Sequence, residues 1–238
     1  MSKVIILVPT YNEIENLEKA ISAIHHHASQ AHILVIDDQS PDGTGDLADR
    51  LAEQDERIHV LHRQAKEGLG RAYLAGFAWS LAYDYELIFE MDADLSHPAE
   101  AIPRMMEAAH QGADLVLGSR WVKGGGVVGW PLKRKILSRG GSLYARLILG
   151  APIKDFTGGF KCFKRDTLLQ INLADVSAVG YGFQIDLTWR ALQKGLVVKE
   201  IPIIFTDRVA GKSKMSADIF KEALLLVWKL RFAQKNLK

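Results

Sequence analysis

Residues 86–100, ELIFEMDADLSHPAE, carry the clearest indication of both the fold and the chemistry. The apolar run at residues 87–89 is typical of a buried strand. Directly after it stand Asp92 and Asp94, two carboxylates that repel each other unless a positive charge lies between them. The segment therefore predicts a strand that ends where a cation could be held.

A divalent metal ion suits this spacing. Side chains two residues apart on a strand point to the same side, so both carboxylates can converge on one ion. Mg²⁺ or Mn²⁺ is commonly held by one or two carboxylates together with substrate phosphates. Because the D-x-D pattern also arises by chance and at helix caps, its position after a strand is what favours a metal site.

Outward from this segment, apolar strands alternate with helical patterns. Strands are expected at residues 3–9, 32–38, 57–63, 86–92 and 114–119, with helices at 13–28, 44–54, 69–82 and 98–111. This alternation predicts an α/β fold: a Rossmann-like, mostly parallel sheet flanked by helices on both faces. Ligands of such sheets bind at the carboxyl ends of the strands, so the residues that follow each strand are the candidate site.

The polar residues after the first two strands have two interpretations. Asn12 can cap the following helix, with Glu15 completing a capping box. Asp37 and Asp38 precede a segment with strong turn chemistry, which explains them structurally. A carboxylate at this position could instead accept hydrogen bonds from the base or ribose of a nucleoside.

The second half is less regular. Residues 124–131 are expected to form a loop, and residues 132–149 one amphipathic helix or a broken pair. A strand at 158–165, a helix near 184–193, a strand pair within 196–208 and a last helix near 217–232 follow. Neither a repeat nor a linker divides the chain, so residues 1–238 are predicted to be a single domain.

The charge is distributed unevenly along the chain. Residues 1–119 hold 8 Lys and Arg against 20 Asp and Glu, a net of −12, whereas residues 120–238 hold 22 against 8, a net of +14. An acidic half could hold a cation beside a basic half that could hold phosphate. The alternative is one domain with two differently charged solvated faces.

Other features argue against several functions. Residues 124–129 match G-x-G-x-x-G but do not lie between a strand and a helix, so nicotinamide chemistry is not predicted. Adjacent residues 25–27, all His, point in different directions and cannot converge on one metal. Cys162 is the single cysteine, which excludes an internal disulfide, fits a reducing cytosol and favours a packing role. Neither a signal peptide nor a membrane-spanning run of about 20 apolar residues is predicted.

Nine segments together resemble the dolichol- or polyprenol-phosphate mannose synthases, inverting nucleotide-sugar glycosyltransferases of the A-type fold. In order, these segments are VPTYNEIENL (8–17), VIDDQSPDGT (35–44), GLGRAYLAGF (68–77), MDADLSHP (91–98), GSRW (118–121), GWPLKRKILSRG (129–140), DFTGGFKCFKR (155–165), GYGFQIDL (180–187) and DRVAGKSKM (207–215). The resemblance spans about residues 4–216, and nine ordered motifs are far more specific than one.

The resemblance implies a reaction and a set of site residues. Mannose would pass from GDP-mannose to a polyprenyl or dolichyl phosphate with inversion, giving polyprenyl-phosphate mannose. Asp92 and Asp94 would bind Mg²⁺ or Mn²⁺, with Ser96 where some relatives have a Gln that contacts the metal. The remaining implied residues would bind the donor (Pro9, Tyr11, Glu13, Asp38 and Ala93) or surround the phosphates (Arg120, Arg134, Ser138, Arg208 and Lys214).

General physical chemistry agrees with this reaction. A phosphate monoester, with a second pKa of about 6, is already an anion at neutral pH, so no general base is required. Asp186 is the weaker alternative, a candidate base. Arginines from Arg120 onward can bring the anionic acceptor beside the anionic donor through bidentate hydrogen bonds.

A lipid acceptor implies contact with a membrane surface. Residues 132–149 combine an apolar stripe with Lys and Arg, the composition of an interfacial helix on anionic lipid, and residues 217–232 could add a second stripe. Both stripes could alternatively pack on the core or in a dimer. The expected location is peripheral, on the cytoplasmic face of a membrane, and a separate membrane protein as partner is left open.

Three competing functions follow from the same residues. The donor could be UDP-glucose, which would leave the mechanism unchanged. The chain could be a non-catalytic module that binds a nucleotide sugar or an anionic lipid, against which the D-x-D motif and the arginines argue. Nucleic-acid binding is not expected, because the basic residues interleave with aliphatic ones and few aromatic residues are present for stacking.

Overall fold

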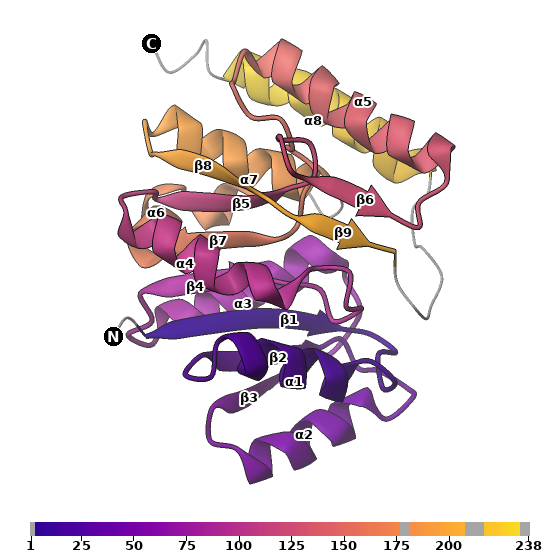
Figure 1. Ribbon diagram of the computed structural model, residues 1–238, viewed down its shortest axis with the longest axis vertical. Helices are drawn as coiled ribbons and strands as arrows, with labels where there is room; N and C mark the ends of the chain where they lie inside the picture. The colour runs from indigo at the N-terminus through magenta and orange to yellow at the C-terminus, as the bar shows by residue number, and fades with distance from the viewer. Residues whose placement is uncertain (1–2, 177–180, 208–216, 234–238) are drawn as a thin grey trace.

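Apolar strands form a seven-stranded sheet at the centre of the computed structural model, which describes residues 3–176, 181–207 and 217–233 (Figure 1). Its order is β3-β2-β1-β4-β7-β5-β8. The strands of this sheet are β1 (Val4–Thr10), β2 (His32–Asp37), β3 (Ile58–His62), β4 (Leu87–Glu90), β5 (Leu115–Ser119), β7 (Lys161–Lys164) and β8 (Val198–Pro202). A second, two-stranded sheet pairs β6 (Gly126–Val128) with β9 (Ile204–Thr206).

The central sheet is mostly parallel, which confirms the predicted fold class. Strand β1 pairs in parallel with β2 and β4, and β5 pairs in parallel with β8. Strand β7 is antiparallel to both of its neighbours, β4 and β5. The carboxyl ends of β1, β2 and β4 therefore meet at one edge, where the candidate site lies.

Helices cover both faces of the sheet. They are α1 (Leu17–His27), α2 (Thr44–Gln54), α3 (Leu69–Leu81), α4 (Ile102–His110), α5 (Leu132–Leu149), α6 (Arg165–Gln170), α7 (Tyr181–Gln193) and α8 (Ala217–Ala233), with short 3-10 turns η1 (Ala99–Ala101) and η2 (Leu173–Asp175). Apolar residues of α1, α2 and α4 pack on one face, and those of α3, α5, α7 and α8 contribute to the core on the other.

Glycine permits one of the closest helix-to-sheet contacts. A Cβ atom at Gly76 of α3 would lie 2.5 Å from Ile36 Cδ1 and 3.0 Å from Leu7 Cδ1. Helix α3 can therefore lie directly on β1 and β2, and it carries Tyr73 toward the end of β4.

Three expectations from the sequence need correction. Helix α1 begins at Leu17, and Asn12 adopts a left-handed conformation (φ 59°) instead of capping a helix. The expected loop at 124–131 contains strand β6. The expected strand at 158–165 ends at Lys164, because the chain turns into α6 at Arg165.

The glycine run at residues 124–126 has a packing role. A Cβ atom at Gly125 would lie 2.5 Å from the carbonyl oxygen of Ser119, so only glycine lets this segment approach the end of β5. The literal match to a dinucleotide motif thus reflects a close backbone contact.

Helices α5 and α8 lie side by side at one end of the molecule, remote from α2 at the other (Figure 1). Residues 132–149 form one continuous helix, which resolves the alternative of a broken pair. Within the described ranges, none of the helices is long and apolar enough to cross a membrane.

Candidate functional site

The loops that follow β1, β2 and β4 form the candidate site at the carboxyl edge of the sheet. Each contains a non-glycine residue in the left-handed region: Asn12 (φ 59°), Gln39 (φ 58°) and Leu95 (φ 62°). Such conformations cost free energy and persist only where surrounding contacts hold them, and they concentrate at functional sites.

Residues 92–97, here called the D-x-D loop, follow β4 directly. Asp92 is partly exposed, with 33 % of its side chain accessible, and one of its carboxylate oxygens accepts a hydrogen bond from the Tyr73 hydroxyl at 3.3 Å. Asp94 is buried, and its Oδ1 accepts the backbone N–H of Ser96 at 3.1 Å. Burial raises the pKa of Tyr73 well above 10, so its hydroxyl stays protonated and donates to Asp92.

The two carboxylates fit a divalent cation that also binds a diphosphate. In the described part of the chain, no group of three or more His, Cys, Asp or Glu side chains is arranged to hold a metal. A pair of carboxylates is, however, what Mg²⁺ or Mn²⁺ usually takes from a protein when phosphate oxygens complete its coordination. Ser96, the expected additional ligand, is buried in the same loop.

The loops after β1 and β2 are tied together by hydrogen bonds. The backbone N–H groups of Asn12 and Glu13 donate to the hydroxyls of Ser40 and Thr44, at 3.1 and 3.0 Å. The Tyr11 ring lies under the Lys66 ammonium, 3.7 Å from its centroid. Tyr11, Glu13 and half-buried Pro9 therefore lie at the same edge as the D-x-D loop.

Asp38 and Ala93 are less available to a ligand than the sequence suggested. Arg63 forms an ion pair with Asp38. Burial raises the pKa of Asp38, and Arg63 opposes that rise. The Ala93 side chain is buried in the core on the α1 and α4 side, so a substrate would contact its backbone.

Arg120 follows β5 and is held by a buried carboxylate. Its Nε and Nη2 donate to the two oxygens of Asp155, both at 2.7 Å, and its backbone N–H donates to Asp155 at 2.9 Å. Arg120 is 6 % exposed and Asp155 is fully buried. Burial alone would raise the pKa of Asp155, but Arg120 outweighs burial and the net pKa is lowered.

Arg134 and Ser138 lie one turn apart on the more buried side of α5. The Arg134 guanidinium lies over the Trp130 ring, 4.1 Å from its centroid, and donates to Asp207 Oδ1 at 2.7 Å. Trp130 also contacts Phe205, and the Arg120 guanidinium is 5.5 Å from the Trp130 ring. Two of the predicted phosphate-binding arginines thus flank one aromatic side chain.

Two predicted phosphate ligands, Arg208 and Lys214, lie outside the described residues. Asp186, the candidate base, accepts a hydrogen bond from Arg190 Nε at 2.7 Å within α7. Asp186 is buried, and this ion pair with a residue one turn away on the same helix accounts for it structurally.

Reasoning from the sequence missed several neighbours of the site. His97 contacts the backbone of Asp92, and Phe205 lies between His97, Trp130 and Arg120. In the sequence, the spacing of His97 after the D-x-D motif could have indicated the contact between His97 and Asp92. Phe205 lies in the predicted strand pair within residues 196–208, and nothing in that segment indicates its neighbours.

Two further buried charged side chains, Glu90 and Lys161, belong to register partners on the adjoining strands β4 and β7. Burial raises the pKa of Glu90 and lowers that of Lys161. The charge of each residue opposes these shifts by favouring the charged form of the other. Lys161 Nζ donates to the Gln184 carbonyl oxygen and the Thr188 hydroxyl of α7. These contacts attach α7 to the sheet close to the D-x-D loop.

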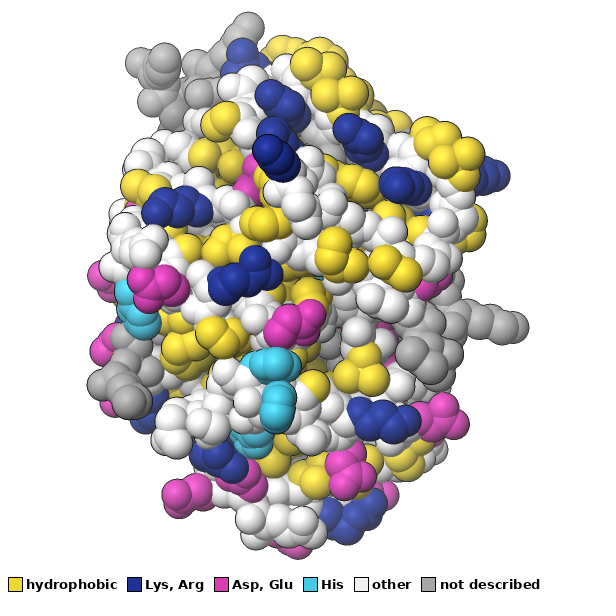
Figure 2. Space-filling model, viewed as in Figure 1, with side chains coloured by type: hydrophobic (Ala, Val, Ile, Leu, Met, Phe, Trp, Pro, Cys, Tyr) yellow, Lys and Arg dark blue, Asp and Glu magenta, His cyan; other side chains and the backbone are white. Residues whose placement is uncertain are grey.

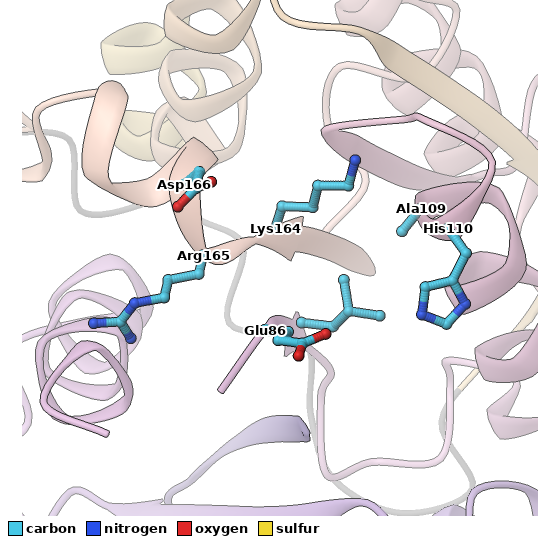
Figure 3. Close-up of a pocket in the computed structure, with 7 residues that line it drawn as sticks. Glu86, Ala109, His110, Lys164, Arg165 and Asp166 are labelled. Carbon is cyan, nitrogen blue, oxygen red and sulfur yellow. The ribbon is translucent and has the colours of Figure 1, made fainter. Parts of the chain in front are cut away.

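A pocket of about 370 Å³ lies at the amino end of β4 (Figure 3). Its two basic residues already have structural partners: Lys164 pairs with Asp114, and Arg165 donates to the carbonyl oxygens of Leu81 and Tyr83. The pocket is at the opposite end of β4 from Asp92, so it is not the candidate site. It is lined by Glu86, Leu87, Ala109, His110, Lys164, Arg165 and Asp166.

Comparison with known proteins gives consistent matches. Residues 5–171 match the family model described as glycosyl transferase family 2. A polyprenol monophosphomannose synthase of Mycolicibacterium smegmatis is 50 % identical over 232 residues, which cover 96 % of this chain and 88 % of that protein. An undecaprenyl-phosphate mannosyltransferase of Micrococcus luteus is 48 % identical over 225 residues, which cover 94 % of this chain and 92 % of that protein.

Solved structures with the same fold are more distant in sequence. Glucosyl-3-phosphoglycerate synthase from Mycobacterium tuberculosis, in complex with Mn²⁺, UDP and glucosyl-3-phosphoglycerate, gives a TM-score of 0.69 at 17 % identity and covers 96 % of this chain and 80 % of that one. A mannosyltransferase from Pyrobaculum calidifontis, in complex with GDP-mannose and Mn²⁺, gives a TM-score of 0.60 at 18 % identity. That match covers 96 % of this chain and 69 % of the mannosyltransferase. At these identities the likeness shows the fold alone.

Proposed function

Because the chain belongs to glycosyl transferase family 2, we propose that it transfers mannose from GDP-mannose to a polyprenyl phosphate with inversion. The observation that carries the proposal is the similarity to two relatives, each identical to this chain at about half of the aligned residues over nearly its whole length. One is named for polyprenol monophosphomannose and the other for undecaprenyl phosphate. The product would be polyprenyl-phosphate mannose, a lipid-linked sugar.

Asp92 and Asp94 are the proposed ligands of Mg²⁺ or Mn²⁺, with Ser96 beside them. Both carboxylates follow β4, at the edge where the loops after β1 and β2 would bind the nucleoside. When bound, the metal neutralises charge that develops on the departing nucleoside diphosphate. The Tyr73 hydrogen bond orients the Asp92 carboxylate for this role.

The proposed donor site combines the loops after β1 and β2. Tyr11 offers a ring face to the base, and Glu13 and Asp38 offer acceptors to base and ribose. Pro9 and the backbone of Ala93 would line the same site. The hydrogen bonds from Asn12 and Glu13 to Ser40 and Thr44 hold the two loops in one arrangement before the nucleotide arrives.

The proposed acceptor site comprises Arg120, Arg134 and Ser138, together with Arg208 and Lys214. An anionic phosphate oxygen of the acceptor would attack the anomeric carbon through an oxocarbenium-like transition state. Because this nucleophile is already ionised, the protein needs to supply positive charge and alignment, not a base. Asp155 fixes the plane of the Arg120 guanidinium, and Trp130 fixes that of Arg134.

Helices α5 and α8 supply a surface suited to a membrane. Their exposed apolar residues include Leu132, Leu147 and Leu225, each more than 70 % exposed. Figure 2 shows hydrophobic side chains interspersed with Lys and Arg over this end of the molecule. We propose that this face rests on anionic lipid at the cytoplasmic face of a membrane, so that the acceptor phosphate reaches Arg134 from the lipid surface.

The donor and the metal are tested in one assay. Transfer of labelled sugar to a short polyprenyl phosphate is measured with GDP-mannose and with UDP-glucose, each with Mn²⁺ and with EDTA. Metal-dependent product from GDP-mannose alone is expected. Product from UDP-glucose alone would overturn the proposed sugar, and no product from either would favour a non-catalytic binding module or a missing membrane partner.

A further inference from the structure

The D-x-D loop closes on itself through a histidine side chain. His97, at the end of the loop, is 4 % exposed, and its Nδ1 accepts the backbone N–H of Asp92 at 3.0 Å. The last residue of the loop thereby fixes the backbone of the first. This contact is separate from the carboxylates themselves and from the Tyr73 hydrogen bond to Asp92.

Aromatic packing fixes the orientation of the His97 ring. Phe160 stacks on it with centroids 5.1 Å apart and an interplanar angle of 13°, and Phe205 meets it edge-on at 5.4 Å and 77°. Because Nδ1 accepts a hydrogen bond, the neutral ring carries its proton on Nε2. That atom lies 3.9 Å from Asp92 Oδ2, so one ring faces both the backbone and the carboxylate of Asp92.

The loop needs such a support because its backbone is strained. Leu95 has a φ of 62°, in the left-handed region that non-glycine residues rarely adopt. Two further hydrogen bonds hold the loop: the Ser96 backbone N–H donates to the Asp94 carboxylate, and the backbone N–H of Thr206 in β9 donates to the Ser96 carbonyl oxygen at 3.3 Å. An apolar side chain in place of His97 would leave the Asp92 N–H without its acceptor.

We propose that His97 is a positioning residue of the metal site: its Nδ1 presets the backbone of Asp92, so that Asp92 and Asp94 are already arranged to bind a divalent cation. This inference rests on the proposed metal-binding function of the two carboxylates. Residues that orient metal ligands typically change metal affinity by about 10–100-fold when replaced.

Two near-isosteric variants separate hydrogen bonding from packing. The amide oxygen of His97→Asn can occupy the place of Nδ1 and accept the Asp92 N–H. The longer side chain of His97→Gln places its amide nearer the position of Nε2 and loses that acceptor. His110→Gln, at the other end of α4 and remote from the D-x-D loop, is the matched control.

Mn²⁺ binding is measured by electron paramagnetic resonance in the presence of GDP, with a thermal melt of each variant without metal. We expect His97→Asn and His110→Gln to bind Mn²⁺ within about threefold of the wild type, and His97→Gln about 10–100-fold more weakly. Equal affinity in all variants, or an equal loss in both His97 variants, would overturn the inference. Should His97→Gln not fold, a loss above about tenfold in folded His97→Asn would also overturn it.

Asp94→Asn separates this inference from the proposed function. If Asp94→Asn binds Mn²⁺ as tightly as the wild type, the metal role of the D-x-D loop itself fails. If Asp94→Asn loses Mn²⁺ while both His97 variants retain it, the metal role stands and only the role of His97 fails.

Discussion

At the scale of single residues, the carboxylates of the D-x-D loop make the strongest prediction. Asp94→Ala should lower sugar transfer by at least about 1,000-fold, because a metal contributes several kcal/mol to transition-state stabilisation. The fold should survive, since the Asp94 carboxylate accepts a hydrogen bond from the Ser96 backbone N–H within its own loop. Transfer and thermal melting are measured on the same preparation, and unchanged turnover would refute the metal role.

Arg134 is predicted to act on the acceptor and not on the nucleotide. Removal of a charge-assisted hydrogen bond costs about 1.5–3 kcal/mol, so Arg134→Ala should raise the KM for polyprenyl phosphate by about 10–100-fold. The dissociation constant of GDP, measured by calorimetry, should change by less than about twofold. Comparable losses in both quantities would contradict the assignment, and Arg134→Lys controls for charge without the planar guanidinium.

Residue identities in the site were partly predictable from the sequence. Asp92 and Asp94 were accessible to prediction because they follow a strand directly, so local pattern determines their place. The buried pair between Arg120 and Asp155 joins residues far apart in sequence, and no spacing rule indicates it. The same is true of Phe205, which reaches the site through the second, small sheet.

At the scale of elements, the strands and most helices were predictable because each carries its own periodic apolar pattern. The exceptions have physical reasons. Asn12 turns the chain in a left-handed conformation, which delays the start of α1 to Leu17. Strand β7 is antiparallel, and a single strand's sequence contains nothing that specifies the direction of its neighbours.

Helix α5 carries the prediction for the membrane surface. Leu143 and Leu147 are 50 % and 71 % exposed, so replacing both by Ser should leave the fold intact. Binding to vesicles that contain anionic lipid should weaken by about tenfold or more, because buried Leu side chains contribute about 1.5–3 kcal/mol each. Transfer to a water-soluble short-chain acceptor without vesicles should be unchanged.

Leu169→Ser is the matched control for that measurement. Leu169 is 59 % exposed but lies on α6, away from the α5 and α8 surface. Vesicle sedimentation that responds equally to all of these substitutions, or to none of them, would contradict a specific membrane role for α5.

At the scale of the whole molecule, a histidine pair predicts how stability depends on pH. His32 Nδ1 and His59 Nε2 are 2.9 Å apart, and the Tyr85 hydroxyl lies within 3.3 Å of both. Burial, followed by nearby positive charge including Lys3, lowers the pKa of each histidine below 6.5. Their contribution to stability is therefore present above about pH 6.5 and is lost as the pH falls through the folded-state pKa values.

The measurement is thermal melting of the wild type and His59→Gln at pH 7.5 and 5.5. The unfolded chain binds more protons than the folded chain in this range. The melting temperature of the wild type should therefore fall more on acidification than that of the variant. Equal losses in the two proteins would show that this pair does not govern the acid sensitivity.

The arrangement of the whole molecule joins the proposed donor and acceptor sites. The loops after β1, β2 and β4 lie at one edge of the sheet, and β9 brings Phe205 and Asp207 between the D-x-D loop and α5. The division into an acidic nucleotide-binding half and a basic acceptor-binding half remains a prediction. Its physical basis is that both halves contribute strands to one sheet, which places Arg120 after β5 in the same sheet that carries Asp92 and Asp94 after β4.

The most direct test of the central claim is the structure of the lipid product. Wild-type protein is incubated with GDP-mannose, Mn²⁺ and a short polyprenyl phosphate, and the product is analysed by mass spectrometry and by NMR of the anomeric centre. A polyprenyl phosphate that carries one mannose in β linkage is predicted, because the transfer inverts an α-linked donor. An α-linked product, or free mannose without lipid-linked sugar, would contradict the proposed reaction.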